Sequence, residues 1–240
     1  MAAAMEPVFD DCAGWRRIYV DLPGCGQSPA GPADSDGVVD AVAEFVDREV
    51  GTGPILLAGC SYGGYLAAAL ARRRPERIAG LLLVCPGIKI LAEDRDLPEA
   101  QDSPAAADWL AGLPSQLRAH LSSALGNRTR DVAARVAAVL ASSDPGDEEY
   151  LQRLRTTGYR LSDEDSAVQY GGPTCIVTGR QDHVVGHADQ YRALAAYPQA
   201  SFTVLAEAGH YIPFEQPDAF RRLIRDWLAR CFTVLDLPGG

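Results

Sequence analysis

The sequence predicts an α/β protein built on a doubly wound, mostly parallel sheet, with a helical cap inserted before the fourth strand. Three observations support this fold class. Five short runs of aliphatic and β-branched residues have the composition of buried parallel strands, at 17–21, 54–59, 78–85, 174–178 and 201–205. Helical periodicity fills most of the segments between these runs. The strands stop between residues 93 and 169, where helix starts replace them.

The helices of the outer layers are predicted from apolar stripes. One helix precedes Gly51, one follows the second strand over residues 65–74, and one lies near the C-terminus. The stripes of the first and last helices are Val38, Val42, Phe45 and Val46, and Leu223, Ile224, Trp227 and Leu228. Such a stripe gives each helix a face that can pack on the sheet.

The cap is predicted from residues that favour N-cap and N1 positions, at 102–104, 114–115, Asp131 and Asp147. We therefore assign residues 93–169 to the cap, and residues 1–92 and 170–240 to the α/β core. The cap carries fourteen acidic residues and eight arginines. This excess suits cationic or amine substrates, and solvated helix faces explain it equally well.

Length, composition and charge limit the classes of partner. A chain of 240 residues, 47% hydrophobic and 22% charged, can bury one α/β core plus an insertion. Its net charge of −10 opposes binding to nucleic acid and to anionic membranes. The start has no basic or apolar signal region, and the longest apolar stretch, 78–88, is too short to span a bilayer. These features predict a cytoplasmic protein that acts on a small molecule.

No metal or cofactor is expected. The six cysteines are spread singly without a C-x-x-C pair, which indicates reduced, mostly buried thiols. His183 and His187 are four residues apart beside Asp182, a spacing that two metal ligands on one helix face can have. Gly186 interrupts the turn between them and the sequence contains no H-E-x-x-H, so a surface helix start explains His187 better.

The strongest chemical signal is the G-x-S-x-G pattern at residues 59–63, between the strand 54–59 and a helix that opens with small residues. A serine at such a sharp turn projects its hydroxyl outward, and glycines on both sides keep Cβ atoms out of the adjacent strand and helix. The amide of Tyr62, at the helix N-terminus, faces the oxyanion that acyl transfer develops. Ser61 is the predicted nucleophile and Tyr62 the predicted oxyanion-hole donor.

A serine hydroxyl needs a base, and His210 is the best of the four histidines. It follows the strand 201–205 in a short loop, which places it at the carboxyl edge of the sheet where Ser61 also opens. Asp182 follows the strand 174–178 in the same way, so its carboxylate can accept the Nδ1 proton of the histidine. We predict a triad of Ser61, His210 and Asp182.

These residues resemble the α/β-hydrolase superfamily, in the branch that holds esterases, proline iminopeptidase-like enzymes, carbon–carbon bond hydrolases and cofactor-free haloperoxidases. Three motifs carry the resemblance: residues 21–28 (DLPGCGQS), residues 59–64, and residues 179–182 together with 208–210. The resemblance implies that Ser61 forms an acyl-enzyme, that His210 then activates water, and that the cap selects the substrate. A serine at the elbow argues against epoxide hydrolase and haloalkane dehalogenase activity, which use an aspartate there.

The sequence departs from the family pattern before Asp21. The first three strands of the eight-stranded family sheet have no counterpart there, nor has the H-G loop that donates the second oxyanion amide. One of these strands would lie between 17–21 and the strand that bears Ser61, so an exposed strand edge is expected. Residues 6–15 match the first helix of the family pattern, which favours a truncated start. Loss of one oxyanion donor typically costs about 100- to 1,000-fold in turnover.

The sequence therefore supports two functions. The first is a serine hydrolase of a small or medium ester, amide or related acyl substrate, with an esterase slightly ahead of an aminopeptidase. The alternative is a non-catalytic or weakly active ligand-binding or sensor protein of the same fold, because the oxyanion loop has no counterpart.

Overall fold

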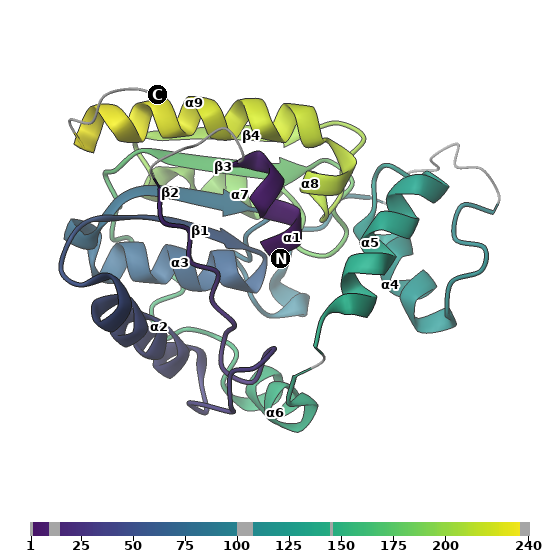
Figure 1. The fold of residues 1–240 in the computed structure, drawn as a ribbon, viewed down its shortest axis with the longest axis horizontal. Coiled ribbons are helices and arrows are strands. Elements are labelled where there is room, and N and C mark those ends of the chain that lie inside the picture. The colour runs from purple at the N-terminus through teal and green to yellow at the C-terminus, as the bar shows by residue number, and fades with distance from the viewer. Residues whose placement is uncertain (1, 10–14, 100–107, 145, 236–240) are drawn as a thin grey trace.

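The computed structural model describes residues 2–9, 15–99, 108–144 and 146–235. Its centre is a parallel sheet whose strands lie side by side in chain order (Figure 1). The strands are β1 (Ile55–Cys60), β2 (Ile78–Val84), β3 (Thr174–Gly179) and β4 (Ala200–Leu205). They confirm the four later strand predictions to within one residue at either end. Because parallel strands end at the same edge, the loops that follow them converge there.

Helices cover both faces of this sheet, as the doubly wound prediction requires. α3 packs on one face with α2 beside it, and α9 covers the other face (Figure 1). The helices and turns are α1 (Ala2–Met5), η1 (Glu6–Val8), α2 (Ser35–Val50), α3 (Tyr62–Arg73), η2 (Pro75–Arg77), η3 (Ala92–Asp94), α4 (Ser115–Ala124), α5 (Arg130–Ser142), α6 (Glu148–Thr157), α7 (Ala188–Arg192), η4 (Ala193–Ala196), α8 (Ile212–Glu215) and α9 (Pro217–Leu235). Within the described ranges, none of these combines the length and apolar character that a bilayer span requires.

The alternation of side chains along β2 divides the core between the two faces. Leu81 and Leu83 pack with the small residues of α3, whereas Leu82 and Val84 pack with α9. All four are essentially inaccessible to solvent. A strand buried on both faces reads as a continuous apolar run, which is why this strand was identifiable from sequence.

The predicted strand at 17–21 is wrong. These residues form no ladder, and the apolar positions 18–20 are between 36% and 44% exposed. Side chains hold the segment instead, since Arg17 and Tyr19 both donate hydrogen bonds to the carboxylate of Glu6. In the described part of the chain, no strand lies between this segment and β1. The segment has high β-propensity, but it has no neighbouring strand with which to form a ladder.

The expected exposed strand edge is present at β1. Every residue of β2 and β3 is buried, whereas no residue of β1 is fully buried and Ala58 is exposed. Only β2 pairs with β1 among the described residues. The strand that leads into the predicted nucleophile therefore has one open side.

The helical insertion between β2 and β3 separates into two parts. α4 and α5 pack on each other and against Tyr211 and Phe214 at α8, and they project from the core (Figure 1). α6 instead buries Tyr150 and Leu154 in the cluster that α2 and α3 share. We call the first part the α4–α5 lobe.

The helix starts within the insertion were predicted with mixed success. α4 begins at Ser115, and Asp147 caps α6, as expected. α5 begins at Arg130 because the Thr129 hydroxyl accepts the amide hydrogen of Val132, so Asp131 lies inside the first turn. The predicted start at 102–104 falls outside the described residues.

Replacing Asp147 with alanine should lower the free energy of unfolding by about 1 kcal/mol, the usual cost of losing an N-cap. The Asp147 carboxylate accepts the amide hydrogen of Tyr150 at 2.9 Å, and Tyr150 is a buried member of the core. Urea unfolding followed by circular dichroism measures the change. An unchanged midpoint would show that water replaces the cap without cost.

Candidate active site

Ser61 stands at the turn between β1 and α3 with strained backbone angles. Its φ is 54° and its ψ is −121°, a conformation that a residue with a side chain rarely adopts. Backbone hydrogen bonds hold it there: its amide donates to the Val84 carbonyl at 3.0 Å, and its carbonyl accepts from Tyr65 at 3.0 Å and from Gly87 at 3.1 Å. These hydrogen bonds from neighbouring segments hold the Ser61 backbone in its strained conformation.

The glycines around Ser61 differ in what they make room for. A Cβ at Gly59 would lie 2.3 Å from the Gly63 carbonyl oxygen, and one at Gly64 would lie 2.9 Å from Pro86. A Cβ at Gly63 would meet nothing within 4 Å. The expectation that both glycines of the motif relieve crowding holds for Gly59, whereas the second crowded position is Gly64.

The amide of Tyr62 is available to an oxyanion. Tyr62 is the first residue of α3, and no carbonyl in the described ranges accepts its amide hydrogen. The Tyr62 side chain is held by a 2.8 Å hydrogen bond between its hydroxyl and that of Ser35. The helix N-terminus adds a favourable field for negative charge at the same point.

Asp182 and His210 are joined by a hydrogen bond between Oδ2 and Nδ1 at 2.8 Å. Asp182 is fully buried in the loop after β3, and His210 is 8% exposed in the loop after β4. The other carboxylate oxygen of Asp182 accepts the amide hydrogens of Val184 at 2.8 Å and Val185 at 3.0 Å. Each oxygen thus has its own partners, which fixes the direction in which the carboxylate faces the imidazole.

Asp182 remains ionised in this environment. Burial opposes its ionisation, yet the adjacent His210 and the amides of Val184 and Val185 hold the pKa of Asp182 below its usual value. An ionised carboxylate at Nδ1 keeps the proton on that nitrogen and leaves Nε2 free to accept another.

The structure brings Ser61 to the same sheet edge as this pair without a direct hydrogen bond between them. In the described part of the chain, no group hydrogen-bonds to the Ser61 hydroxyl. The Ser61 amide donates to the Val84 carbonyl. The next residue, Cys85, has its sulfur within 4.8 Å of a carboxylate oxygen of Asp182 and of a ring nitrogen of His210. Nucleophile and base often close to hydrogen-bond distance only when substrate is bound.

Cys85 contacts the loop that carries His210 through its thiol. It leaves β2 with a φ of 41°, and its sulfur lies 3.5 Å from the Gly209 carbonyl oxygen. Burial raises the pKa of Cys85 well above its usual value, so the thiol stays protonated and can donate to that oxygen. The sulfur, Asp182 and His210 would suit a metal ion by type, but a cation there would have to displace the proton that Asp182 and His210 share.

The cysteines agree with the predicted free thiols where the structure describes them. Cys25, Cys60, Cys85, Cys175 and Cys231 are free thiols, and Cys12 lies outside the described residues. His187 is the N-cap of α7, as the predicted helix start requires, but it is half-buried and its Nδ1 is inaccessible to solvent.

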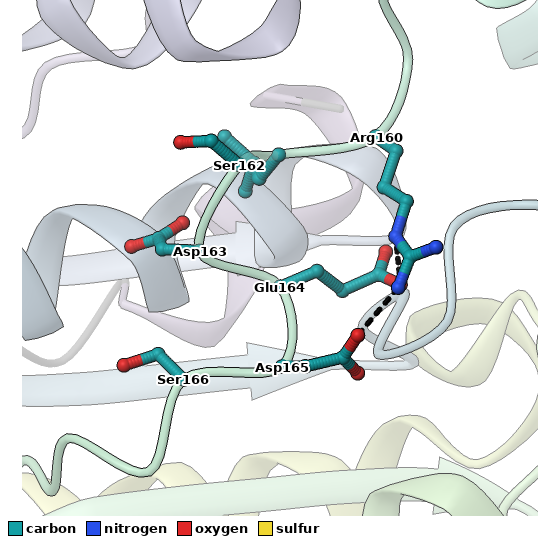
Figure 2. A pocket seen from close by; sticks show the side chains of 7 residues that line it. Arg160, Ser162, Asp163, Glu164, Asp165 and Ser166 are labelled. Carbon is teal, nitrogen blue, oxygen red and sulfur yellow. Dashed lines mark hydrogen bonds and ion pairs between the residues drawn. The ribbon is translucent and has the colours of Figure 1, made fainter.

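A second charged cluster lies on the return segment after α6. Residues 160–166 line a surface pocket that contains none of the predicted catalytic groups (Figure 2). Its acids are already paired: Arg160 contacts both Glu164 and Asp165, and Lys89 contacts Asp165. The Glu164 side chain is buried and also accepts from the Tyr65 hydroxyl at 2.7 Å. The cluster fastens the insertion to the core.

Sequence reasoning missed Glu215. This residue ends α8, five positions after His210, and is 4% exposed. It accepts the backbone amide hydrogens of the residues on both sides of His210. The only sequence signal was a single acid at the end of the apolar run 211–214, which is weak because such an acid can equally lie in solvent.

A profile of the α/β hydrolase fold matches residues 3–217, which is most of the chain. The chain belongs to the α/β hydrolase family. The curated relatives fall into two groups by name, methyl ester esterases and hydrolases of a hydroxy-oxo-dienedioate or -trienedioate. A pimeloyl-[acyl-carrier protein] methyl ester esterase of Neisseria meningitidis serogroup A is 29% identical, over 99% of this chain and 76% of the relative. A 2-hydroxy-6-oxononadienedioate/2-hydroxy-6-oxononatrienedioate hydrolase of Klebsiella pneumoniae is 27% identical, over 94% of this chain and 80% of the relative.

Solved structures agree on the fold of this α/β hydrolase. An α/β superfamily hydrolase from Oenococcus oeni superposes with a TM-score of 0.74 at 23% identity, covering 96% of this chain and 86% of that one. A meta-cleavage product hydrolase from Pseudomonas fluorescens superposes with a TM-score of 0.70 at 24% identity, covering 95% and 84%. Membership of the family and relatives that are hydrolases together support hydrolase activity.

Proposed function

We propose that this α/β hydrolase is a serine esterase that cleaves a small or medium acyl ester through Ser61, His210 and Asp182. The observation that carries the proposal is the buried 2.8 Å hydrogen bond between Asp182 and His210, at the sheet edge where the strained turn presents Ser61. Strained backbone costs stability, and a buried carboxylate with a perturbed pKa beside a histidine is typical of functional sites, so their presence at one edge favours such a site.

The proposed reaction follows from the atoms at this edge. His210 Nε2 takes the proton of the Ser61 hydroxyl as Oγ attacks the ester carbonyl, and the Tyr62 amide donates to the resulting oxyanion. The tetrahedral intermediate expels an alkoxide, which receives the same proton from His210 and leaves as the alcohol. Water then attacks the acyl-enzyme with His210 as base, and the acid and free Ser61 are released.

Asp182 acts through the imidazole and is not itself protonated. Its two oxygens are held by His210 on one side and by the amides of Val184 and Val185 on the other. The carboxylate therefore fixes the Nδ1–H tautomer before the reaction and stabilises the imidazolium that forms during it.

An ester is preferred to an amide because of the relatives. A relative at 29% identity is named a methyl ester esterase, and one at 27% identity is named a 2-hydroxy-6-oxononadienedioate/2-hydroxy-6-oxononatrienedioate hydrolase; neither name contains an amide. We further propose that the α4–α5 lobe caps the site, because Ser123 and Ala124 contact the loops of Asp182 and His210 through backbone hydrogen bonds. The lobe then borders the acyl-binding region and selects the substrate.

A fluorophosphonate probe tests the nucleophile directly. Such a probe phosphonylates only a serine whose hydroxyl a base can activate. We expect stoichiometric modification of the wild-type protein at Ser61, mapped by peptide mass spectrometry, and none in Ser61→Ala.

Hydrolysis of a series of p-nitrophenyl esters of increasing acyl length then ranks the substrates. Ser28→Ala is a matched control, because Ser28 Oγ donates to the backbone of Asp21 and Ser28 lies outside the proposed triad. If folded wild-type protein is not labelled and hydrolyses none of these esters, the non-catalytic ligand-binding alternative holds instead.

A further inference from the structure

The loop that carries His210 rests on one buried carboxylate. Glu215 Oε1 accepts the amide hydrogens of Gly209 at 2.9 Å and Tyr211 at 3.0 Å, the residues directly before and after His210. Gly209 also lies 2.9 Å from Oε2. Burial raises the pKa of Glu215, although its amide hydrogen bonds oppose that shift.

The same carboxylate holds the connection between α4 and α5. Glu215 Oε2 accepts the amide hydrogens of Gly126 at 2.7 Å and Asn127 at 2.8 Å. Two segments more than eighty residues apart in sequence therefore share one acceptor group. If Glu215 moves with one of these segments, the amides of the other segment lose their hydrogen-bond acceptor.

Direct contact tightens this junction. The His210 amide donates to the Ala124 carbonyl at 2.6 Å. A Cβ at Gly126 would lie 2.5 Å from the backbone of Ala208, and one at Gly209 would lie 2.2 Å from the Ala124 carbonyl oxygen. Glycine on each side allows the two backbones to touch.

We propose that Glu215 is a positioning residue, which couples the α4–α5 lobe to His210 and so sets the imidazole against Ser61 and Asp182. This inference rests on the proposed function. Glu215 contacts none of the reacting atoms, and its effect passes through the backbone on both sides of His210. A lobe that closes over substrate would thereby complete the alignment of the base.

Glu215→Gln separates the two halves of the junction. A carboxamide has one acceptor oxygen, so its NH₂ group must face the amide hydrogens of one of the two segments. We expect kcat and the rate of fluorophosphonate labelling to fall by about 10- to 100-fold, the cost of misplacing a catalytic group by roughly 1 Å, with little change in KM. The downfield proton resonance of His210 Nδ1–H bonded to Asp182 should broaden or disappear.

Gly126→Ala attacks the junction from the lobe without touching Glu215. Its Cβ would push the α4–α5 connection off Ala208, so we expect the same loss of labelling rate and the same change in the proton resonance. Glu164→Gln is the control, because Glu164 is an equally buried carboxylate bonded to Tyr65 and the Ile90 amide. It should lose thermal stability yet keep the wild-type labelling rate and resonance.

The outcomes separate this inference from the proposed function. If the wild-type protein is not labelled at Ser61, the proposed function fails. If it is labelled, and folded Glu215→Gln or Gly126→Ala is labelled as fast as Glu164→Gln, the coupling is disproved. If neither variant folds, hydrogen exchange of the wild-type protein decides: the amides of Gly126, Asn127, Gly209 and Tyr211 should open together, and independent opening of the two segments overturns the proposal.

Discussion

Asp182→Asn should lower kcat by about 10³- to 10⁴-fold without disrupting the fold, because it reverses the tautomer of His210, the proposed base. Asp182 Oδ1 accepts the amide hydrogens of Val184 and Val185, and Oδ2 accepts from His210 Nδ1. An asparagine keeps its single oxygen toward the two amides, so its NH₂ group faces the imidazole. Nδ1 must then accept, the proton moves to Nε2, and Nε2 can no longer take the proton of Ser61.

Steady-state ester hydrolysis and the rate of fluorophosphonate labelling both measure this loss. Asp189→Asn is a matched control, because Asp189 is also a mostly buried carboxylate, bonded to the Asp96 amide and to Arg192 and outside the proposed triad. A variant of Asp182 that hydrolyses esters at the wild-type rate would show that another group orients His210.

Asp182 also links folding to pH. Its pKa in the folded protein is lowered, so it contributes stability above its unfolded value of about 3.9 and loses that contribution as the pH falls through the folded value. The difference in the free energy of unfolding between the wild type and Asp182→Asn should therefore shrink below about pH 4. Urea unfolding at several acidic pH values measures it. A difference that is independent of pH would show that folding does not lower the pKa of Asp182.

Local sequence was sufficient where one element decides the outcome by itself. β2 and β3 are buried on both faces, so their sequences are apolar throughout. The turn at Ser61 needs a strand before it, a helix after it and glycine at tight positions, and all three are local features. The hydrogen bond between Asp182 and His210 was predictable because both residues follow parallel strands, which end at one edge.

Local sequence was insufficient where a distant partner decides the outcome. Residues 17–21 have β-propensity, but strand formation depends on a neighbour that the described residues do not supply. Glu215 is a single acid in sequence, and its role arises from amides of two segments that only the tertiary fold brings together. Thr129 and not Asp131 is the N-cap of α5; both residue types cap helices well, so local sequence could not choose between positions two residues apart.

Gly59→Ala should destabilise the protein by about 3 kcal/mol, at the upper end of the cost of overpacking. The new Cβ would lie 2.3 Å from the Gly63 carbonyl oxygen, 2.6 Å from the Gly63 carbonyl carbon and 2.7 Å from Gly64 Cα. These are backbone atoms at the start of α3, so relief requires the helix to move away from β1 and to carry the Ser61 turn with it. We therefore expect labelling of Ser61 to slow by about 100-fold in whatever protein remains folded.

Gly63→Ala provides the opposite result from the other glycine of the same motif. A Cβ at Gly63 meets nothing within 4 Å, and the residue lies in the first turn of α3. Alanine is the better helix former, so the free energy of unfolding should stay unchanged or rise by up to about 1 kcal/mol. Urea unfolding of both variants gives the contrast. Equal destabilisation by the two alanines would mean that the turn is crowded on both sides of Ser61. The prediction that only Gly59 must be glycine for steric reasons would then be wrong.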